Sequence, residues 1–246
     1  MQITEHMYLV ASGDMGLALT HPQDCNVYAI KVQDGFLLVD SGVGVEPEKI
    51  ETVLEKDGLS PEKMRAILLT HGHADHSGGA AYFQKQYGAQ IIGPKAEKEF
   101  VEQALEGPLG LDIARQAGFY PADYRLAPCV FSDCVSPGDT RTIFGMLFEV
   151  YEAAGHSIGG VCYRAKIDGK QTLFVGDLIS ADGKISLQNI PGAEIAAYSR
   201  SVLALENVEI EALMTGHGHF MLNRGVVPIK KVCSKFRNLA VPENIF

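Results

Sequence analysis

Short apolar runs alternate with amphipathic stretches along the whole chain, a pattern typical of a mixed α/β protein. Apolar runs of strand length predict strands over 3–10, 26–31, 36–39, 65–70, 89–92, 140–144, 147–153, 160–167, 171–175 and 212–214. Apolar residues at helical spacing predict helices over 46–56, 79–87, 94–105, 194–205 and 226–238, and a short helix that ends near residue 117. Strands and helices therefore occur twice in a similar order.

Turn residues mark the tightest connections between the predicted strands. The segments Gln33-Asp34-Gly35 and Asp168-Gly169 each lie between two strand runs and predict hairpins. Segment 93–138 differs, because its helical pattern is interrupted at Gly107-Pro108 and is followed by aromatic and proline residues. We expect a single domain over 1–246, with a helical insertion at about 93–138 that covers one face of the core.

Charge and composition argue against several classes of partner. The 246 residues include 21 basic and 30 acidic groups, a net charge of −9, and no Lys/Arg cluster that would favour nucleic acid. No apolar window approaches the ~18–20 residues of a membrane span, and the N-terminal segment does not resemble a signal peptide. The five cysteines contain no C-x-x-C pair and fit free thiols, so we expect a cytoplasmic protein.

Six of the eight histidines gather in three short glycine-bearing segments, each after a strand-like run. These segments are 70–76 (Thr-His-Gly-His-Ala-Asp-His), 155–157 (Gly-His-Ser) and 216–219 (Gly-His-Gly-His). Neutral imidazole is the commonest metal ligand near neutral pH. The pattern therefore predicts that loops at strand ends converge on one metal site.

The segment 70–76 holds three imidazoles and one carboxylate directly after a predicted buried strand. A strand-to-helix turn here can point His71 and His73 one way while Asp75 and His76 point another. One metal can then take the first two side chains and a second metal the other two.

The run from His71 to His76 resembles the H-x-H-x-D-H signature of the metallo-β-lactamase superfamily. Further landmarks of that family follow in the correct order, each within two residues of a glycine: Asp40, His156, Asp177 and His217. The resemblance covers nearly the whole chain. It implies an α/β fold of the αββα type, a four-layer sandwich with a dinuclear metal site at one edge.

The resemblance also implies the metal ligands and the cofactors. One metal would be bound by His71, His73 and His156, the second by Asp75, His76 and His217, and Asp177 would bridge the two. The implied cofactors are two divalent ions, zinc in the first place, with iron and manganese as alternatives. Two cations would make the pocket locally positive in an acidic chain, which suits an anionic or carbonyl-bearing small molecule.

Two-metal chemistry predicts hydrolysis, because a water shared by two cations ionises near neutral pH and can attack a polarised carbonyl. Asp75 is the candidate catalytic residue, which would orient this water and pass its proton to the leaving group. Asp40 would accept an N–H from a ligand imidazole, although a turn-forming role fits its local pattern equally well. His219 is a candidate for substrate binding, but a similar supporting contact or a plain loop position is favoured.

We predict hydrolysis of a small ester, lactone or thioester by a metal-bridging hydroxide. A flavodiiron role is disfavoured because such relatives carry Glu at the position of His73. Glyoxalase II-like relatives have an added helical region for glutathione, whereas only a short segment follows His217. The alternative is an oxidoreductase similar to the sulfur dioxygenases, with one iron at His71, His73 and His156. A binding protein without catalysis is the third hypothesis, which the complete ligand set disfavours.

The insertion is expected to set specificity, because loops around a fixed site usually contact the substrate. Its aromatic residues Phe119, Tyr120 and Tyr124 can either line a pocket or pack the insertion onto the core. The same surface, or an exposed strand edge, can form a homodimer. The natural substrate, the native metal and the oligomeric state stay open at this level.

Overall fold

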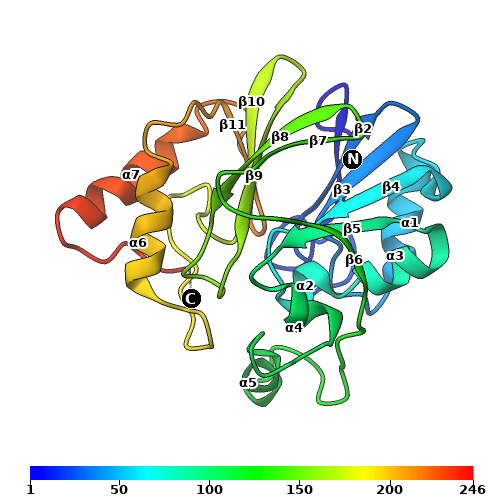
Figure 1. Cartoon of the computed structure of the whole chain (residues 1–246), viewed down its shortest axis with the longest axis horizontal. Helices are drawn as coiled ribbons and strands as arrows, with labels where there is room; N and C mark the ends of the chain where they lie inside the picture. The colour runs from blue at the N-terminus through cyan, green and yellow to red at the C-terminus, as the bar shows by residue number, and fades with distance from the viewer. Residues whose placement is uncertain (246) are drawn as a thin grey trace.

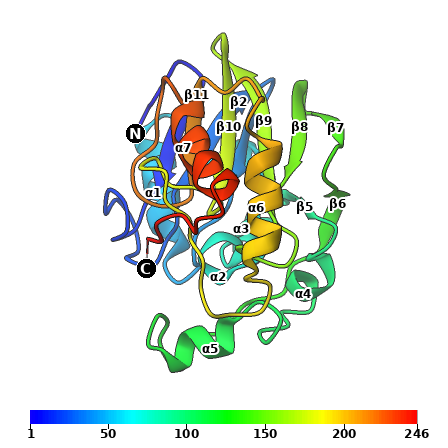
Figure 2. The ribbon, with the colours of Figure 1, turned by 90° about the vertical axis from the view of Figure 1, so that its left-hand side faces the viewer.

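Two β-sheets lie face to face at the centre of the structure, a computed structural model that describes residues 1–245. Helices α1 (Pro47–Lys56) and α3 (Ala80–Tyr87) cover the outer face of the first sheet, and α6 (Ile195–Ala204) and α7 (Val226–Arg237) cover the second (Figure 1). Figure 2 shows α6 and α7 side by side in front of the second sheet. The predicted four-layer αββα sandwich is confirmed.

The first sheet has the strand order β1-β2-β3-β4-β5-β6. Its strands are β1 (Met7–Ala11), β2 (Val27–Val32), β3 (Gly35–Val39), β4 (Met64–Leu68), β5 (Gln90–Pro94) and β6 (Phe131–Val135). The first three are antiparallel neighbours, whereas β3 to β6 are parallel and therefore need crossover connections. The connections after β3 and β4 contain α1, the 3₁₀ turn η1 (Pro61–Lys63), the short α2 (Ala74–Ser77) and α3. The carboxyl ends of β3, β4 and β5 consequently share one edge.

The second sheet has the order β11-β10-β9-β8-β7. Its strands are β7 (Thr140–Ile143), β8 (Met146–Glu152), β9 (Val161–Ile167), β10 (Lys170–Gly176) and β11 (Ala212–Thr215). All neighbours are antiparallel except β10 and β11. Strands β8, β10 and β11 therefore run in the same direction and end at the same edge.

Strand β2 shows why the apolar runs are continuous and not alternating. Tyr28 and Ile30 face the core between the two sheets, whereas Val27 and Ala29 face the core under α1 and α3. Because both faces of the sheet are buried, each position needs an apolar side chain. Burial of such side chains contributes ~1.5–3 kcal/mol each to folding.

The predicted hairpin between β9 and β10 is confirmed. Asp168 and Gly169 both adopt positive φ, 49° and 83°, as a two-residue type I′ turn requires. The turn also lies against the N-terminal segment, because Asp168 Oδ2 accepts the Thr4 hydroxyl at 2.5 Å.

Segment 93–138 is less helical than the sequence pattern predicted. The helix expected over 94–105 is only α4 (Lys98–Glu102), because Pro94 still pairs with Val135 in the sheet and Ala104 adopts φ of +49°. A second helix, α5 (Leu111–Gln116), follows. Residues 131–135 form the edge strand β6, which the prediction missed because its exposed Ser132 and Asp133 interrupt any apolar run.

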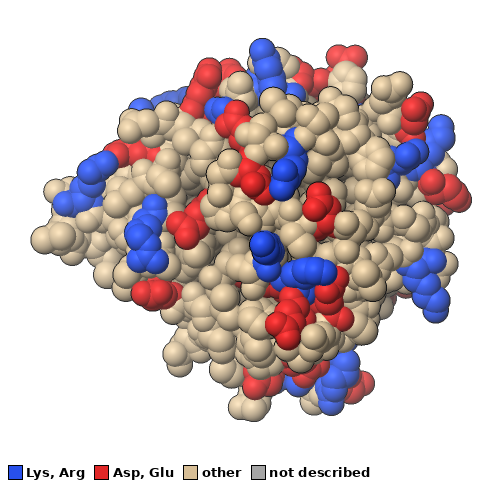
Figure 3. Space-filling view, in the orientation of Figure 1, with Lys and Arg blue, Asp and Glu red and all other residues tan. Residues whose placement is uncertain are grey.

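The surface carries charges of both signs. On the face in Figure 3, Lys and Arg side chains are interspersed with Asp and Glu. In the part of the chain that the structure describes, no helix is long and apolar enough to cross a bilayer.

Candidate metal centre

Loops from both sheets meet at the edge where the carboxyl ends of β3, β4, β8, β10 and β11 lie. The segment 70–76 follows β4 and extends into α2. The loops after β8, β10 and β11 contribute one residue each: His156, Asp177 and His217. The structure therefore brings together side chains that are up to 146 positions apart, from His71 to His217. Their convergence follows from the common direction of the strands.

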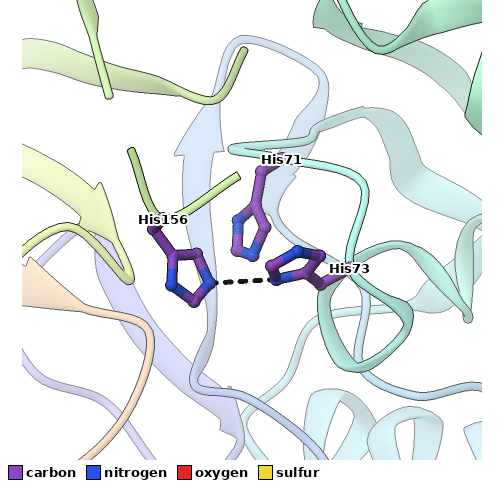
Figure 4. A group of neighbouring side chains, drawn as sticks. All are labelled: His71, His73 and His156. Atoms are coloured by element: carbon purple, nitrogen blue, oxygen red, sulfur yellow. Dashed lines mark hydrogen bonds between the residues drawn. The ribbon is translucent and has the colours of Figure 1, made fainter. Parts of the chain in front are cut away.

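The first group consists of His71, His73 and His156. One nitrogen from each ring lies within 4.8 Å of the others, and all three residues are buried. His73 Nδ1 and His156 Nε2 are 2.9 Å apart (dashed line in Figure 4), and Figure 4 shows the three rings gathered around a common point. Three imidazole nitrogens converging in this way suit a divalent transition metal.

The second group consists of Asp75, His76 and His217, whose ligand atoms again lie within 4.8 Å of one another. Asp75 Oδ2 is 3.0 Å from His217 Nε2 and 3.5 Å from His76 Nε2. His71 and His73 precede α2 while Asp75 and His76 lie in its first turn, so the two pairs come from opposite sides of one short bend.

Asp177 lies between the two groups. Its Oδ1 is 3.2 Å from His76 Nε2, and its Oδ2 is 3.3 Å from His217 Nε2 and 3.5 Å from His156 Nε2. The carboxylate is 6% exposed, so it is shared by the two groups and largely shielded from water.

Burial and nearby charges shift the pKa values of histidines in the two groups in opposite directions. Burial, together with the neighbouring His156, lowers the pKa of His73 to about 3, so this imidazole is neutral at pH 7. Burial would also lower the pKa of His217, but the carboxylates of Asp177 and Asp75 raise it to about 10. His71 and His73 thus offer neutral nitrogen ligands, because burial lowers the pKa of both, and the second group places carboxylates where they stabilise positive charge.

Among the candidate ligands, three buried polar atoms form no hydrogen bond with any described residue: His71 Nε2, His76 Nε2 and Asp177 Oδ1. Leaving such atoms unsatisfied costs ~1–3 kcal/mol each. The same three residues form a further set of ligand atoms within 4.8 Å of one another. A cation held among them would satisfy all three, so the residues fit the divalent ions that the family resemblance implies.

Asp40 orients the candidate ligand His76. Its Oδ2 accepts from His76 Nδ1 at 2.8 Å, and its Oδ1 accepts the Thr70 N–H at 2.8 Å. The Thr70 hydroxyl contacts the same carboxylate and lies 3.0 Å from His71 Nδ1. Asp40 adopts φ of +61°, so both roles considered for it, the turn and the imidazole contact, occur together. Thr70 was not singled out from the sequence, although it directly precedes the histidine motif.

His156 is oriented by the backbone of Ser186, because its Nδ1 lies 2.6 Å from the Ser186 carbonyl oxygen. The sequence contains no signal for this contact, since any residue supplies a carbonyl. His219 does not reach the ligand groups: its side chain is 62% exposed and its Nε2 is 3.8 Å from Asp182. The supporting contact considered for His219 is therefore absent, because the residue lies two positions past His217 and turns outward after Gly218. His6, which pairs with Asp168, also lies outside the site.

A cavity of about 420 Å³ opens beside the two groups. Five candidate ligands reach its wall: His73, Asp75, His156, Asp177 and His217. A small molecule in this cavity would touch both groups at once, and the volume is in the range of small-molecule sites.

The aromatic residues of the insertion divide between the two roles considered for them. Phe119 and Tyr120 line the cavity, and the Tyr120 hydroxyl donates to Asp75 Oδ1 at 3.0 Å. Tyr124 stacks on Tyr120 and donates to the Val43 carbonyl, so it packs the insertion onto the core.

The chain is similar to curated bacterial proteins that are named as hydrolases. The chain is 28% identical to the probable metallo-hydrolase YybB of Bacillus subtilis over 177 residues, 72% of this chain and 70% of that protein. It is 25% identical to the hydroxyacylglutathione hydrolase GloC of Haemophilus influenzae over 181 residues, 72% of this chain and 78% of that protein.

Solved structures show the same fold. A metallo-beta-lactamase family protein from Thermus thermophilus superimposes with a TM-score of 0.75 at 18% identity, over 96% of this chain and 81% of that one. A metallo-beta-lactamase from Cronobacter sakazakii gives 0.73 at 16% identity, over 97% and 96%. The family model of the metallo-beta-lactamase superfamily matches residues 21–217, most of the chain. This protein therefore belongs to the metallo-beta-lactamase superfamily.

Proposed function

We propose that this protein is a hydrolase that uses two divalent metal ions, zinc in the first place, to cleave a small ester, lactone or thioester. The observation that carries the proposal is the pair of three-residue ligand groups, joined by Asp177 and open to one cavity. A small molecule is the partner that such a cavity suits.

The two sets of ligand atoms support an assignment of ligands to each ion. His71, His73 and His156 would hold one ion, Asp75, His76 and His217 the other, and the carboxylate of Asp177 would serve both. Bound there, the ions would supply a water that ionises near neutral pH and a Lewis acid for the carbonyl oxygen.

The remaining steps belong to the side chains. Asp75 lies at the cavity wall, where its carboxylate can accept the proton of the attacking water and return it to the leaving oxygen or sulfur. The Tyr120 hydroxyl fixes one oxygen of this carboxylate and leaves the other beside His217. Asp40 and Ser186 hold the rings of His76 and His156 so that their Nε2 atoms face the centre.

The alternative, a sulfur dioxygenase-like oxidoreductase with one iron, would need only the first group. The second group favours the hydrolase, because Asp75, His76 and His217 offer a second set of ligand atoms within 4.8 Å of one another. Metal analysis separates the two functions: about two ions per chain favour hydrolysis, and a single iron favours the oxidoreductase.

The direct test is turnover of a panel of esters, lactones and thioesters by the purified protein, before and after treatment with a chelator. We expect turnover of at least one class, its loss with the chelator, and its recovery with Zn²⁺ or Mn²⁺. Absence of chelator-sensitive turnover on every class would overturn the proposal.

A further inference from the structure

The cavity beside the ligand groups has mostly apolar walls. Apart from the ligands, most of its lining is aliphatic or aromatic, contributed by residues 109–120 of the insertion and by the loop 187–190. The apolar members include Leu109, Leu111, Ile113, Leu187 and Ile190. Such walls stabilise a bound group through the apolar area that the group removes from water.

The described residues that line the cavity include no lysine or arginine. Its polar members beyond the ligands are neutral: Tyr120, Gln188 and Asn189. The nearby arginines are turned elsewhere, since Arg115 pairs with Glu106 and Arg125 donates to backbone carbonyls of the insertion. A carboxylate or phosphate bound along these walls, away from the ligand groups and the ions they would hold, would lose its hydration without gaining a cation in return.

The apolar character continues to the mouth of the cavity. Met15, Ile113 and Phe119 line it and are 46%, 40% and 52% exposed, respectively. The loop that carries Met15 is hydrogen-bonded to the loop that carries His217, because the Met15 carbonyl accepts the N–H of Gly218. Exposed apolar side chains that rim a pocket mark a binding surface.

We infer that the substrate carries an uncharged, medium-length apolar acyl group, which lies between residues 109–120 and the loop 187–190 while its carbonyl faces the ligand groups. This inference rests on the proposed hydrolase function. In the reaction, water adds its oxygen to the acyl carbon, the bond to the leaving oxygen or sulfur breaks, and the leaving atom takes a proton of the water. The products are a carboxylic acid and an alcohol or thiol.

The inference separates this protein from its relatives named as hydroxyacylglutathione hydrolases. A glutathione thioester bears two carboxylates and a short hydroxyacyl group, for which these cavity walls offer neither cations nor an advantage. We therefore expect poor turnover of such thioesters beside uncharged ones with longer acyl chains.

The first test is a series of acyl esters with one leaving group and chains from acetyl to decanoyl. Each methylene that enters the apolar cavity should raise kcat/KM by about two- to fourfold, until the cavity is filled. The A114F variant should narrow the cavity and move the preferred chain towards shorter esters by two or more carbons, because Ala114 lines the wall. The A122F variant is the matched control, since Ala122 is exposed in the same insertion and does not line the cavity.

The second test measures binding without turnover. Calorimetry on the purified protein should show that uncleaved N-methyl amides bind more tightly as the acyl chain lengthens, and that A114F weakens the longest while A122F does not. Equal affinity for all chains, or equal turnover of acetyl and octanoyl esters, would overturn the inference while leaving hydrolysis intact. Chain-dependent binding with no chelator-sensitive turnover of any ester would instead overturn the proposed function alone.

Discussion

The strand ends that carry the candidate ligands, here called the ligand edge, and the segment between β5 and β6 line opposite sides of the cavity. The two regions differ in how firmly the surrounding structure fixes their side chains. At the ligand edge, His76 is buried and bonded to Asp40, and His156 is bonded to a backbone carbonyl. In the other segment, α5 has six residues, and Phe119 is half exposed. Burial and hydrogen bonds thus fix the groups that would bind metal, whereas a short, exposed segment supplies much of the cavity wall.

This difference indicates a division of labour. Strand ends of two packed sheets cannot move without breaking the cores, so they suit a geometry that must stay within tenths of an ångström. A segment outside the sheets can change its side chains at little cost to stability. Substitutions at the ligand edge should therefore abolish turnover, and substitutions in the insertion should redirect or modulate it.

The largest effect is expected for D177N. The amide removes the charge that both groups share, so turnover should fall on the order of a thousandfold and the metal content should drop. Mass spectrometry of bound metal and kcat/KM on the best ester give the two readouts. The control is D182N, because Asp182 is an exposed residue on a nearby loop. Retention of two ions and of full turnover by D177N would contradict the shared role.

A smaller effect is expected for D40A, which removes the acceptor that orients His76. Loss of such a contact typically costs about 10- to 100-fold in metal affinity. Competition with a coloured chelator measures this affinity separately from folding. Asp34 also adopts a positive φ, 64°, but in a surface turn, so D34A controls for backbone strain. Equal metal affinity in both variants would show that Asp40 serves the turn alone.

In the insertion, Y120F should lower kcat by about fivefold, because Asp75 loses a hydrogen bond worth ~1 kcal/mol. Metal content should stay unchanged. The stacked neighbour provides the contrast: Y124F removes the hydrogen bond to Val43 and should cost ~1 kcal/mol of stability with kcat preserved. A thousandfold loss in Y120F would mean that the insertion takes part in the chemistry and that the division of labour is wrong.

The smallest effect is expected outside both regions, at the pair of Glu149 and Arg164 on the second sheet. Hydrogen bonds from Arg164 and Tyr151 lower the pKa of Glu149 from 4.5. This stabilisation is present above the unfolded-state pKa and is lost as pH falls through the folded-state value. E149Q should cost at most ~0.5 kcal/mol at pH 7, because Glu149 is 38% exposed, and less near pH 3. Urea unfolding of the wild type and of E149Q at both pH values measures this difference in the free energy of unfolding, and unchanged turnover is the control.

Much of the fold could be predicted from the chain because the signals are local. Apolar runs of strand length and the Asp168-Gly169 turn report the backbone of their own few residues, and both agree with the structure. The edge strand β6 was not predicted, because a strand with only one neighbouring strand can keep exposed polar residues such as Asp133, which interrupt the apolar run. The helix expected from residue 94 is shorter because pairing of Pro94 with Val135 is a long-range contact that periodicity does not report.

The sequence by itself predicted which side chains gather at the strand ends, from the spacing of His71 to His76 and the order of Asp40, His156, Asp177 and His217 along the chain. Only the tertiary structure decided what surrounds them. In the folded chain the Tyr120 hydroxyl donates to Asp75, and His219 faces the solvent. Two segments about 75 positions apart pack together to form an apolar cavity wall. The physical reason is that ligand motifs are read from neighbouring residues, whereas a cavity wall exists only where distant segments pack.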